Sequence, residues 1–257
     1  MAQKMKALWK TSAKPGAELL DADIPKLKPR EVLVKIKASS ICGTDVHIYE
    51  WDNWAKSRIK PPMIFGHEFA GEIVEIGSLV TKRKVGDHVS GETHIADYNC
   101  FQCRIGNAHI CENLKILGVD TNGSYAGYIA LPENNAIPND NSLPHEVATA
   151  QEPLGNAVHT VFSQPVAGNK VSIFGCGPIG LCAIMLCKAA GATEIYAVDA
   201  NDYRLNMAKK LGATLTINAK TEDPAKRINK ETERGVDVFL EMSGNSNALK
   251  SGFESLR

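Results

Sequence analysis

Short apolar stretches separated by glycine-rich turns fill the first half of the chain, as far as about Leu131. Residues 32–38 and 69–76 have the composition of β-strands, and residues 84–89 supply a turn that leads into another strand. This pattern is typical of an all-β segment. It predicts a small β-barrel in this half of the chain.

From about Gly168 the pattern changes to compact apolar runs that alternate with longer helical segments. The expected strands are residues 170–174, 194–199, 215–218 and 236–241, and the expected helices are residues 178–190, 204–211, 225–232 and a segment from Asn247. Strands that alternate with helices predict parallel βαβ units. A dinucleotide-binding sheet normally has six strands. Four strands therefore predict a sheet that is incomplete at its C-terminal end.

The composition excludes several classes of protein. The chain has 257 residues, enough for two domains, and 44% of them are hydrophobic, which allows a sizeable core. The 29 basic and 29 acidic residues balance, which argues against nucleic acid or an anionic membrane as partner. No apolar run approaches the roughly 18 residues needed to cross a bilayer. The charged start lacks an apolar region behind it, so we expect no secretory signal and a cytoplasmic protein.

Seven cysteines, an odd number, argue against a disulfide framework. Cys182 and Cys187 lie on an apolar helical segment, where free cysteine behaves as a small hydrophobic residue. We expect these two side chains in the core. The other cysteines lie close to residues that carry chemistry.

Cys42, His67 and Glu68 are of the residue types that bind a catalytic zinc ion and leave one position open. Adjacent residues on a strand point to opposite faces, so His67 and Glu68 can share a metal only if the backbone turns at Gly66. Glu152 is a further candidate. Because a thiolate and two carboxylates would give the ion a formal charge of −1, we expect Glu68 and Glu152 not to bind tightly together while substrate is bound. The alternative is a hydrogen-bonded core histidine and an inert thiol.

Thr44 and His47 follow Cys42 by two and five residues. Residues three apart share one face of a helix, if a helix begins there. A hydroxyl near the metal and an imidazole beyond it could carry a proton from substrate to solvent. A capping threonine and a surface histidine are the alternative.

Asp97, Cys100, Cys103 and Cys111 have the spacing of a closed metal site. A cysteine is expected at the first of these positions. The Asp97 carboxylate keeps the ligand charge but offers a harder oxygen, at about 2.0–2.2 Å from zinc instead of about 2.3 Å for sulfur. We expect a site that closes but holds zinc less tightly. The alternatives are a three-cysteine site completed by water or His94, or no metal.

Gly175, Gly177 and Gly180 form a glycine motif between an expected strand and an expected helix. These glycines allow a tight turn and close approach of a pyrophosphate to the helix N-terminus. Asp199 ends the next strand, where its carboxylate would bind the adenosine ribose and repel a 2′-phosphate, which favours NAD. Arg204 is a residue type that accepts such a phosphate. A tight strand-to-helix turn without a ligand is the alternative.

Four stretches of the chain resemble the zinc-dependent medium-chain alcohol dehydrogenases. They are ICGTDVHIYEWDNWA at 41–55, PPMIFGHEFAG at 61–71, GETH at 91–94 and QEPLGNAVH at 151–159. The resemblance implies an α/β plus β fold. A GroES-like β-barrel catalytic domain, residues 1–155, would precede a C-terminally incomplete Rossmann NAD-binding domain, residues 156–257.

The resemblance also assigns roles to individual residues. It implies a catalytic zinc on Cys42, His67 and Glu68 with Glu152 nearby and needed for catalysis, a relay through Thr44 and His47, and a structural zinc in the cysteine lobe. It implies NAD contacts at Ile179, Asp199 and Arg204, and a position near the substrate for His94. For His94 the alternative is a structural histidine of the lobe or of a strand.

The activity implied is zinc-dependent oxidation of a small hydroxyl-bearing amino acid, with NAD as hydride acceptor. A polyol or a vicinal diol is the nearest alternative substrate, and a fragment that binds zinc and NAD without turnover is another possibility. A zinc-independent quinone reductase is disfavoured by the Gly-His-Glu motif and the cysteine lobe. Family members continue past the point where this chain stops, and the resemblance implies a homotetramer for the complete protein. Asp97 is the other departure from the family pattern.

Overall fold

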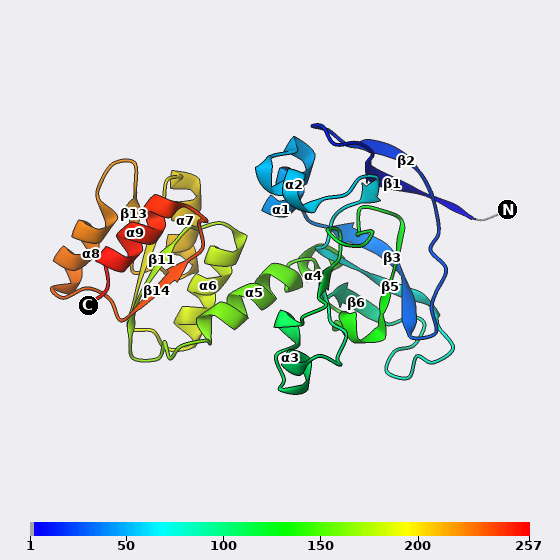
Figure 1. The fold of residues 1–257 in the computed structure, drawn as a ribbon. Helices are drawn as coiled ribbons and strands as arrows, with labels where there is room; N and C mark the ends of the chain where they lie inside the picture. The colour runs from blue at the N-terminus through cyan, green and yellow to red at the C-terminus, as the bar shows by residue number, and fades with distance from the viewer. Residues whose placement is uncertain (1–2) are drawn as a thin grey trace. The chain divides into compact units, whose positions relative to one another are not determined.

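The structure, a computed structural model, describes residues 3–257 and is drawn in Figure 1. The chain divides into two compact units, of which the first ends at Glu152 and the second comprises Pro153–Arg257. Met1 and Ala2, where the segment judged to lack a secretory signal begins, lie outside the described residues. Within residues 3–257, no helix combines the length and the apolar character needed to cross a membrane.

Antiparallel sheets form most of the first unit, as its short apolar stretches predict. The main sheet has the order β10–β6–β5–β3–β9, a smaller one has the order β2–β1–β4, and β7 pairs with β8. The strands are β1 (Lys4–Lys10), β2 (Glu18–Asp23), β3 (Glu31–Ser39), β4 (Met63–Ile64), β5 (Phe69–Ile76), β6 (His88–Gly91), β7 (His94–Ile95), β8 (Lys115–Ile116), β9 (Tyr128–Pro132) and β10 (Ala136–Pro138). The three strands expected from the pattern are β3, β5 and β6.

Alternating side chains of the main sheet bury one face of it. Val32 and Val34 of β3 pack with Phe69 and Ile73 of β5, and all four are at most 1% exposed. Burial of each such side chain contributes about 1.5–3 kcal/mol to stability. The helical elements of this unit are α1 (Gly43–Glu50), α2 (Asn53–Arg58), α3 (Phe101–Arg104), η1 (Ala108–Ile110), η2 (Glu133–Asn135) and α4 (His145–Ala148), with α5 (Gln151–Val161) leading into the second unit.

Four parallel strands form the sheet of the second unit, in the order β13–β12–β11–β14. Its elements are β11 (Lys170–Phe174), α6 (Pro178–Ala189), β12 (Glu194–Asp199), α7 (Asp202–Leu211), β13 (Leu215–Asn218), α8 (Pro224–Thr232), β14 (Val238–Glu241) and α9 (Ser246–Glu254). The strand number and the alternation with helices agree with the sequence pattern. The chain reverses its direction of winding between β11 and β14, which is the arrangement of dinucleotide-binding sheets.

Both faces of this sheet are covered by helices, as Figure 1 shows for α6 and α9. Val171 and Ile173 pack on the side of α6 and α7, whereas Phe174 packs with Ile228 of α8 on the other side. Cys187 is fully buried and Cys182 is partly buried in the same core as α6, which confirms the packing role expected of these thiols.

Two elements of the second unit begin two residues away from the expected position. Helix α7 begins at Asp202, two residues early, because the Asn201 side chain caps it by accepting the N–H groups of Tyr203 and Arg204. Strand β14 begins at Val238 and not at Val236, since Val236 forms an isolated bridge with Leu256. Both differences arise from contacts outside the hydrophobic pattern.

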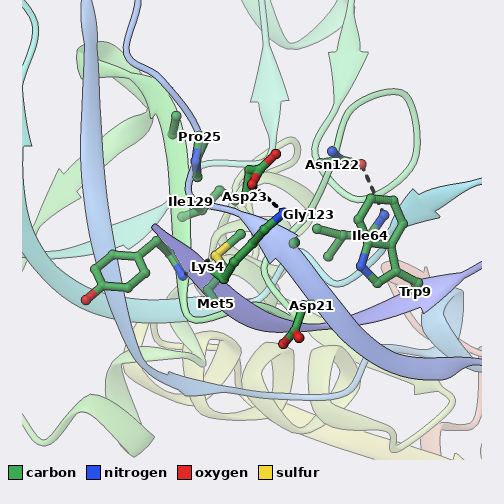
Figure 2. A pocket seen from close by; sticks show the side chains of 13 residues that line it. Lys4, Met5, Trp9, Asp21, Asp23, Pro25, Ile64, Asn122, Gly123 and Ile129 are labelled. Atoms are coloured by element: carbon green, nitrogen blue, oxygen red, sulfur yellow. Dashed lines mark hydrogen bonds and ion pairs between the residues drawn. The ribbon is translucent and has the colours of Figure 1, made fainter. Parts of the chain in front are cut away.

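A cavity of about 390 Å³ lies beside β1 and β2 and is shown in Figure 2. Lys4 and Asp23 pair across its wall, with Nζ and Oδ1 2.6 Å apart, and Asn122 Oδ1 accepts the N–H of Ile64 at 3.1 Å. None of the candidate site residues lines this cavity. It is therefore separate from the sites described next.

Candidate metal and dinucleotide sites

His67 and Glu68 lie in the irregular segment that connects β4 to β5, directly before the expected strand. Gly66, just before them, has φ +91°, a conformation that favours glycine. A Cβ atom on Gly66 would lie 2.7 Å from ring atoms of Tyr125, so no larger residue fits. The strand alternation that would separate the two side chains therefore does not apply here.

Ligand atoms of Cys42, His67 and Glu68 all lie within 4.8 Å of one another. Cys42 is half-buried at the cap of α1, whereas His67 and Glu68 are each only 6% exposed. The Ser40 hydroxyl donates to Oε2 of Glu68 at 2.5 Å, and the Ser40 N–H donates to the Glu68 carbonyl oxygen at 3.0 Å. The bond from the Ser40 hydroxyl thus holds one carboxylate oxygen of Glu68, and the backbone bond fixes the segment that carries it.

Asp45 of α1 contacts both Cys42 and His67 and is only 2% exposed. Its Oδ2 accepts the Cys42 N–H at 2.9 Å and the Tyr125 hydroxyl at 2.8 Å. Its Oδ1 lies 3.6 Å from Nδ1 of His67, the carboxylate–histidine pairing typical of metal-binding histidines. Both of these facing atoms are buried without a hydrogen-bond partner.

The charges around His67 favour a cation. Burial lowers the pKa of His67, but a hydrogen bond with Cys42 and the negative charges of Asp45, Cys42 and Glu152 outweigh it and raise the pKa to about 9. The group therefore combines a thiol, an imidazole and a carboxylate in a buried site that stabilises positive charge. Such a site fits a zinc ion.

Glu152 and His94 lie beside this group but are not part of it among the described residues. The Thr93 hydroxyl donates to Oε1 of Glu152 at 3.2 Å. Glu92 Oε1 accepts the backbone N–H of His94 and lies 2.8 Å from its Nδ1. The hydrogen bond with Glu92 is the largest cause of the raised pKa of His94, and the charge of Glu152 adds to it. His94 therefore carries a proton more readily than a free histidine.

Thr44 and His47 both lie on α1, so the helix on which their shared face depends is present. His47 is exposed and Thr44 is half-buried. His47 Nδ1 lies 2.6 Å from Oδ2 of Asp52, and Asp52 Oδ1 accepts the Ala55 N–H as the cap of α2. The Ala55 bond is the largest cause that lowers the pKa of Asp52, which favours a carboxylate beside His47.

The second group joins ligand atoms of Asp97, Cys100, Cys103 and Cys111 within 4.8 Å of one another. Sγ of Cys100 is 3.8 Å from Sγ of Cys111, and Sγ of Cys103 is 3.6 Å from Oδ1 of Asp97. A tetrahedral zinc ion with ordinary bond lengths requires about 3.8 Å between two sulfur ligands and about 3.6 Å between sulfur and oxygen. The lobe fits zinc by this measure, and His94, the alternative fourth ligand, is not in the group.

Backbone N–H groups of the lobe point at its sulfur atoms. The Glu112 N–H donates to Cys100 at 3.5 Å, and the Asn113 N–H donates to Cys111 at 3.4 Å. The N–H groups of Cys103 and Glu112 lower the pKa of Cys100, and so favour the thiolate form that binds metals.

The glycine motif forms the turn from β11 into α6. Gly175 has φ +101°, and a Cβ atom on Gly180 would lie 1.9 Å from the Gly175 carbonyl oxygen. A Cβ atom on Gly177 would meet nothing within 4 Å. The fold therefore requires glycine at Gly175 and Gly180, whereas Gly177 leaves open space at the N-terminus of α6. That space suits a phosphate group.

Asp199 lies at the end of β12, above this turn. Its Oδ2 accepts the Cys176 N–H at 2.7 Å and its Oδ1 accepts the Asn201 N–H at 2.9 Å. Arg204 Nη1 is 3.9 Å from Oδ2 of Asp199, so the two side chains pair with each other. Ile179, the second residue of α6, is partly buried against the core.

A cavity of about 490 Å³ lies at the carboxyl ends of these strands and includes Asp199 in its wall. Its wall also contains residues that the sequence reasoning missed: Ala200, Ala219, Asp223, Ser243 and Asn245. Ala200 and Ala219 directly follow β12 and β13. Position at the carboxyl end of a parallel strand was the signal that could have found them.

Comparison with known proteins matches both units. The family model described as an alcohol dehydrogenase GroES-like domain matches residues 28–144, and the model described as a zinc-binding dehydrogenase matches residues 178–257. An L-threonine 3-dehydrogenase from Caldanaerobacter subterraneus subsp. tengcongensis is 57% identical over 251 residues, which are 97% of this chain and 72% of that protein. One from Pyrococcus horikoshii is 51% identical over 257 residues, 100% of this chain and 74% of that protein.

Among solved structures, the 2R,3R-butanediol dehydrogenase from Bacillus subtilis superposes with a TM-score of 0.85 at 33% identity. The match covers 98% of this chain and 74% of that chain. The same polypeptide architecture thus occurs in proteins named for different alcohols.

Proposed function

This chain belongs to the zinc-binding medium-chain alcohol dehydrogenases, and from that premise we propose that it oxidises L-threonine to 2-amino-3-oxobutanoate with NAD as hydride acceptor. The observation that carries the proposal is the convergence of Cys42, His67 and Glu68 in a chain whose relatives, 48–57% identical, are named L-threonine 3-dehydrogenase. L-threonine is a small hydroxyl-bearing amino acid, which is the substrate class that the resemblance implies.

We also propose that residues 1–155 form the catalytic domain and residues 156–257 the NAD-binding domain.

Zinc, when bound, would supply a Lewis acid that lowers the pKa of the threonine hydroxyl, and NAD would accept the hydride. Cys42, His67 and Glu68 would hold the metal. One thiolate and one carboxylate neutralise a divalent ion, so Glu152 would act from beside the site while substrate is bound. Its hydrogen bond from Thr93 holds it there.

We assign the removal of the hydroxyl proton to Thr44 and His47. Oδ2 of Asp52 accepts a hydrogen bond from Nδ1–H of His47 at 2.6 Å, and so leaves Nε2 of His47 as the proton acceptor. His47 is exposed, so a proton accepted there can pass to water. Asp52 thus fixes the tautomer that the relay needs.

His94 is the residue that we assign to the substrate's carboxylate. Glu92 holds its imidazole, and the raised pKa of His94 favours the cationic form. A cation beside the metal group would distinguish an amino acid from an uncharged diol. The alternative is that His94 only orders the strand in which it lies.

A substrate panel tests the proposed function. We expect kcat/KM for L-threonine to exceed that for sorbitol and for 2,3-butanediol, measured as NADH formation. A higher value for butanediol would favour the second candidate, a diol dehydrogenase, to which the fold match with the Bacillus subtilis enzyme points. Tight NAD binding with no reduction by any of the three alcohols would identify a chain that binds cofactor without turnover.

Asp199 tests the preference for NAD. Asp199→Ala is expected to weaken NAD binding about 10- to 100-fold, because the hydrogen bonds to its charged carboxylate are lost. The difference in affinity between NAD and NADP should become smaller. The measurement is calorimetric titration with each cofactor. Asp202→Ala is the matched control, because Asp202 is a nearby acid that does not line the cavity. Unchanged NAD affinity in Asp199→Ala would contradict the assignment.

We also propose that the protein is cytoplasmic and that the complete protein is a homotetramer, on the resemblance to the family. Light scattering on the purified protein measures the assembly. A monomer at all concentrations, measured on the complete protein, would contradict the homotetramer.

A further inference from the structure

The two oxygens of the Asp97 carboxylate have different surroundings. Oδ1 accepts the backbone N–H groups of Asn99 and Cys100 at 2.8 and 3.1 Å and lies 3.6 Å from Sγ of Cys103. Oδ2 accepts a hydrogen bond from Nδ2 of Asn113 at 2.6 Å. Oδ1 thus faces the cysteines, and Oδ2 is held by an amide sixteen residues further along the chain.

We propose that Asn113 is a positioning residue for the metal site of the lobe. By holding Oδ2, it makes Asp97 a ligand through Oδ1 alone, so that the site has one oxygen and three sulfur corners. This inference concerns the lobe and is independent of the substrate of the enzyme.

A carboxylate needs such a partner where a thiolate does not. A cysteine at this position would offer one sulfur atom, whereas an aspartate offers two equivalent oxygens and rotates about Cβ–Cγ. Asn113 is exposed, and its backbone N–H donates to Cys111. Its side-chain amide is a separate donor, which the second oxygen of Asp97 accepts. Hydrogen bonds from outside the ligand set that fix a ligand are worth about 10- to 100-fold in metal affinity.

The experiment compares the effect of Asn113→Ala in two backgrounds, one with Asp97 and one with Asp97→Cys. All variants carry His67→Ala in the full chain, which removes a ligand of the other site, so that bound zinc or cobalt reports on the lobe. Zinc affinity is then measured by competition with a chromophoric chelator, with and without Asn113→Ala. The same pair is measured after Asp97→Cys, where no second oxygen remains. The cobalt charge-transfer band, which gains intensity with a fourth thiolate, verifies the ligand change.

Asn113→Ala is expected to lower zinc affinity about tenfold when Asp97 is present. In the Asp97→Cys background the same change is expected to cost less than about twofold, because no carboxylate oxygen remains for Asn113 to hold, and the difference between the two losses measures the coupling. Asn99→Ala is the matched control. Its exposed side chain is removed while its backbone N–H to Asp97 remains, so affinity should not change.

Equal losses in the two backgrounds would overturn the proposal, because Asn113 would then support the loop and not Asp97. Unchanged affinity in Asn113→Ala would overturn it directly, as would full affinity in Asp97→Ala, since Asp97 would not be a ligand. Circular dichroism verifies folding. If Asn113→Ala does not fold, Asn113→Asp keeps the size of the side chain but removes its N–H, and the same criteria apply.

Discussion

Replacing His67 by alanine is expected to abolish threonine-dependent NADH formation while the first unit stays folded. Loss of an outer-shell partner of a metal site typically costs 10- to 100-fold, so loss of a ligand should cost more than about 100-fold. His67 is buried at a point where Asp45 Oδ1 already lacks a hydrogen-bond partner. Zinc analysis should show about one ion per chain fewer than in the parent.

Asp45→Asn provides a graded comparison. It keeps every ligand but removes the negative charge that lies 3.6 Å from Nδ1 of His67. We expect an intermediate loss of zinc affinity and of turnover, about 10- to 100-fold. Near-parental activity in His67→Ala protein that holds no zinc at this site would end the proposed mechanism, because the group of Cys42, His67 and Glu68 would then have lost its imidazole.

Substitution within the glycine motif should separate cofactor binding from folding. Gly177→Ala is expected to weaken NAD binding by about 10-fold or more with little change in melting temperature. Its Cβ would meet nothing within 4 Å of the protein, yet it would fill the space at the N-terminus of α6. Gly180→Ala should lose both NAD binding and stability, because its Cβ would lie 1.9 Å from the Gly175 carbonyl oxygen and force α6 away from β11.

Calorimetric titration with NAD and thermal unfolding followed by circular dichroism measure the two effects. Gly155→Ala is the control, because a Cβ on Gly155 in α5 would also meet nothing within 4 Å. If Gly177→Ala binds NAD as tightly as the parent, the turn does not hold the pyrophosphate. If Gly180→Ala melts with the parent, close packing of α6 on the turn is not required.

Local signals predicted most of the second unit. The strands at 170–174, 194–199 and 215–218 have the expected bounds, because compact apolar runs and glycine stops act within a few residues. The early start of α7 depended on the Asn201 cap, a side-chain bond that hydrophobic periodicity does not register. The turn at Gly66, on which the sharing of a metal by His67 and Glu68 depends, was left open by the sequence for a related reason. Gly66 turns the backbone at φ +91° to make room for Tyr125, which is distant in sequence.

By itself, the sequence determined the alternation of strands and helices, the glycine turn and the residue types able to hold zinc and a dinucleotide, because these depend on neighbours along the chain. Only the tertiary structure decided that Asp45, held by the Tyr125 hydroxyl, contacts Cys42 and His67, and that Asn113 holds one oxygen of Asp97. Such contacts join segments that meet through packing. Their partners are therefore set by how the sheets and loops fold together, and no local pattern specifies them.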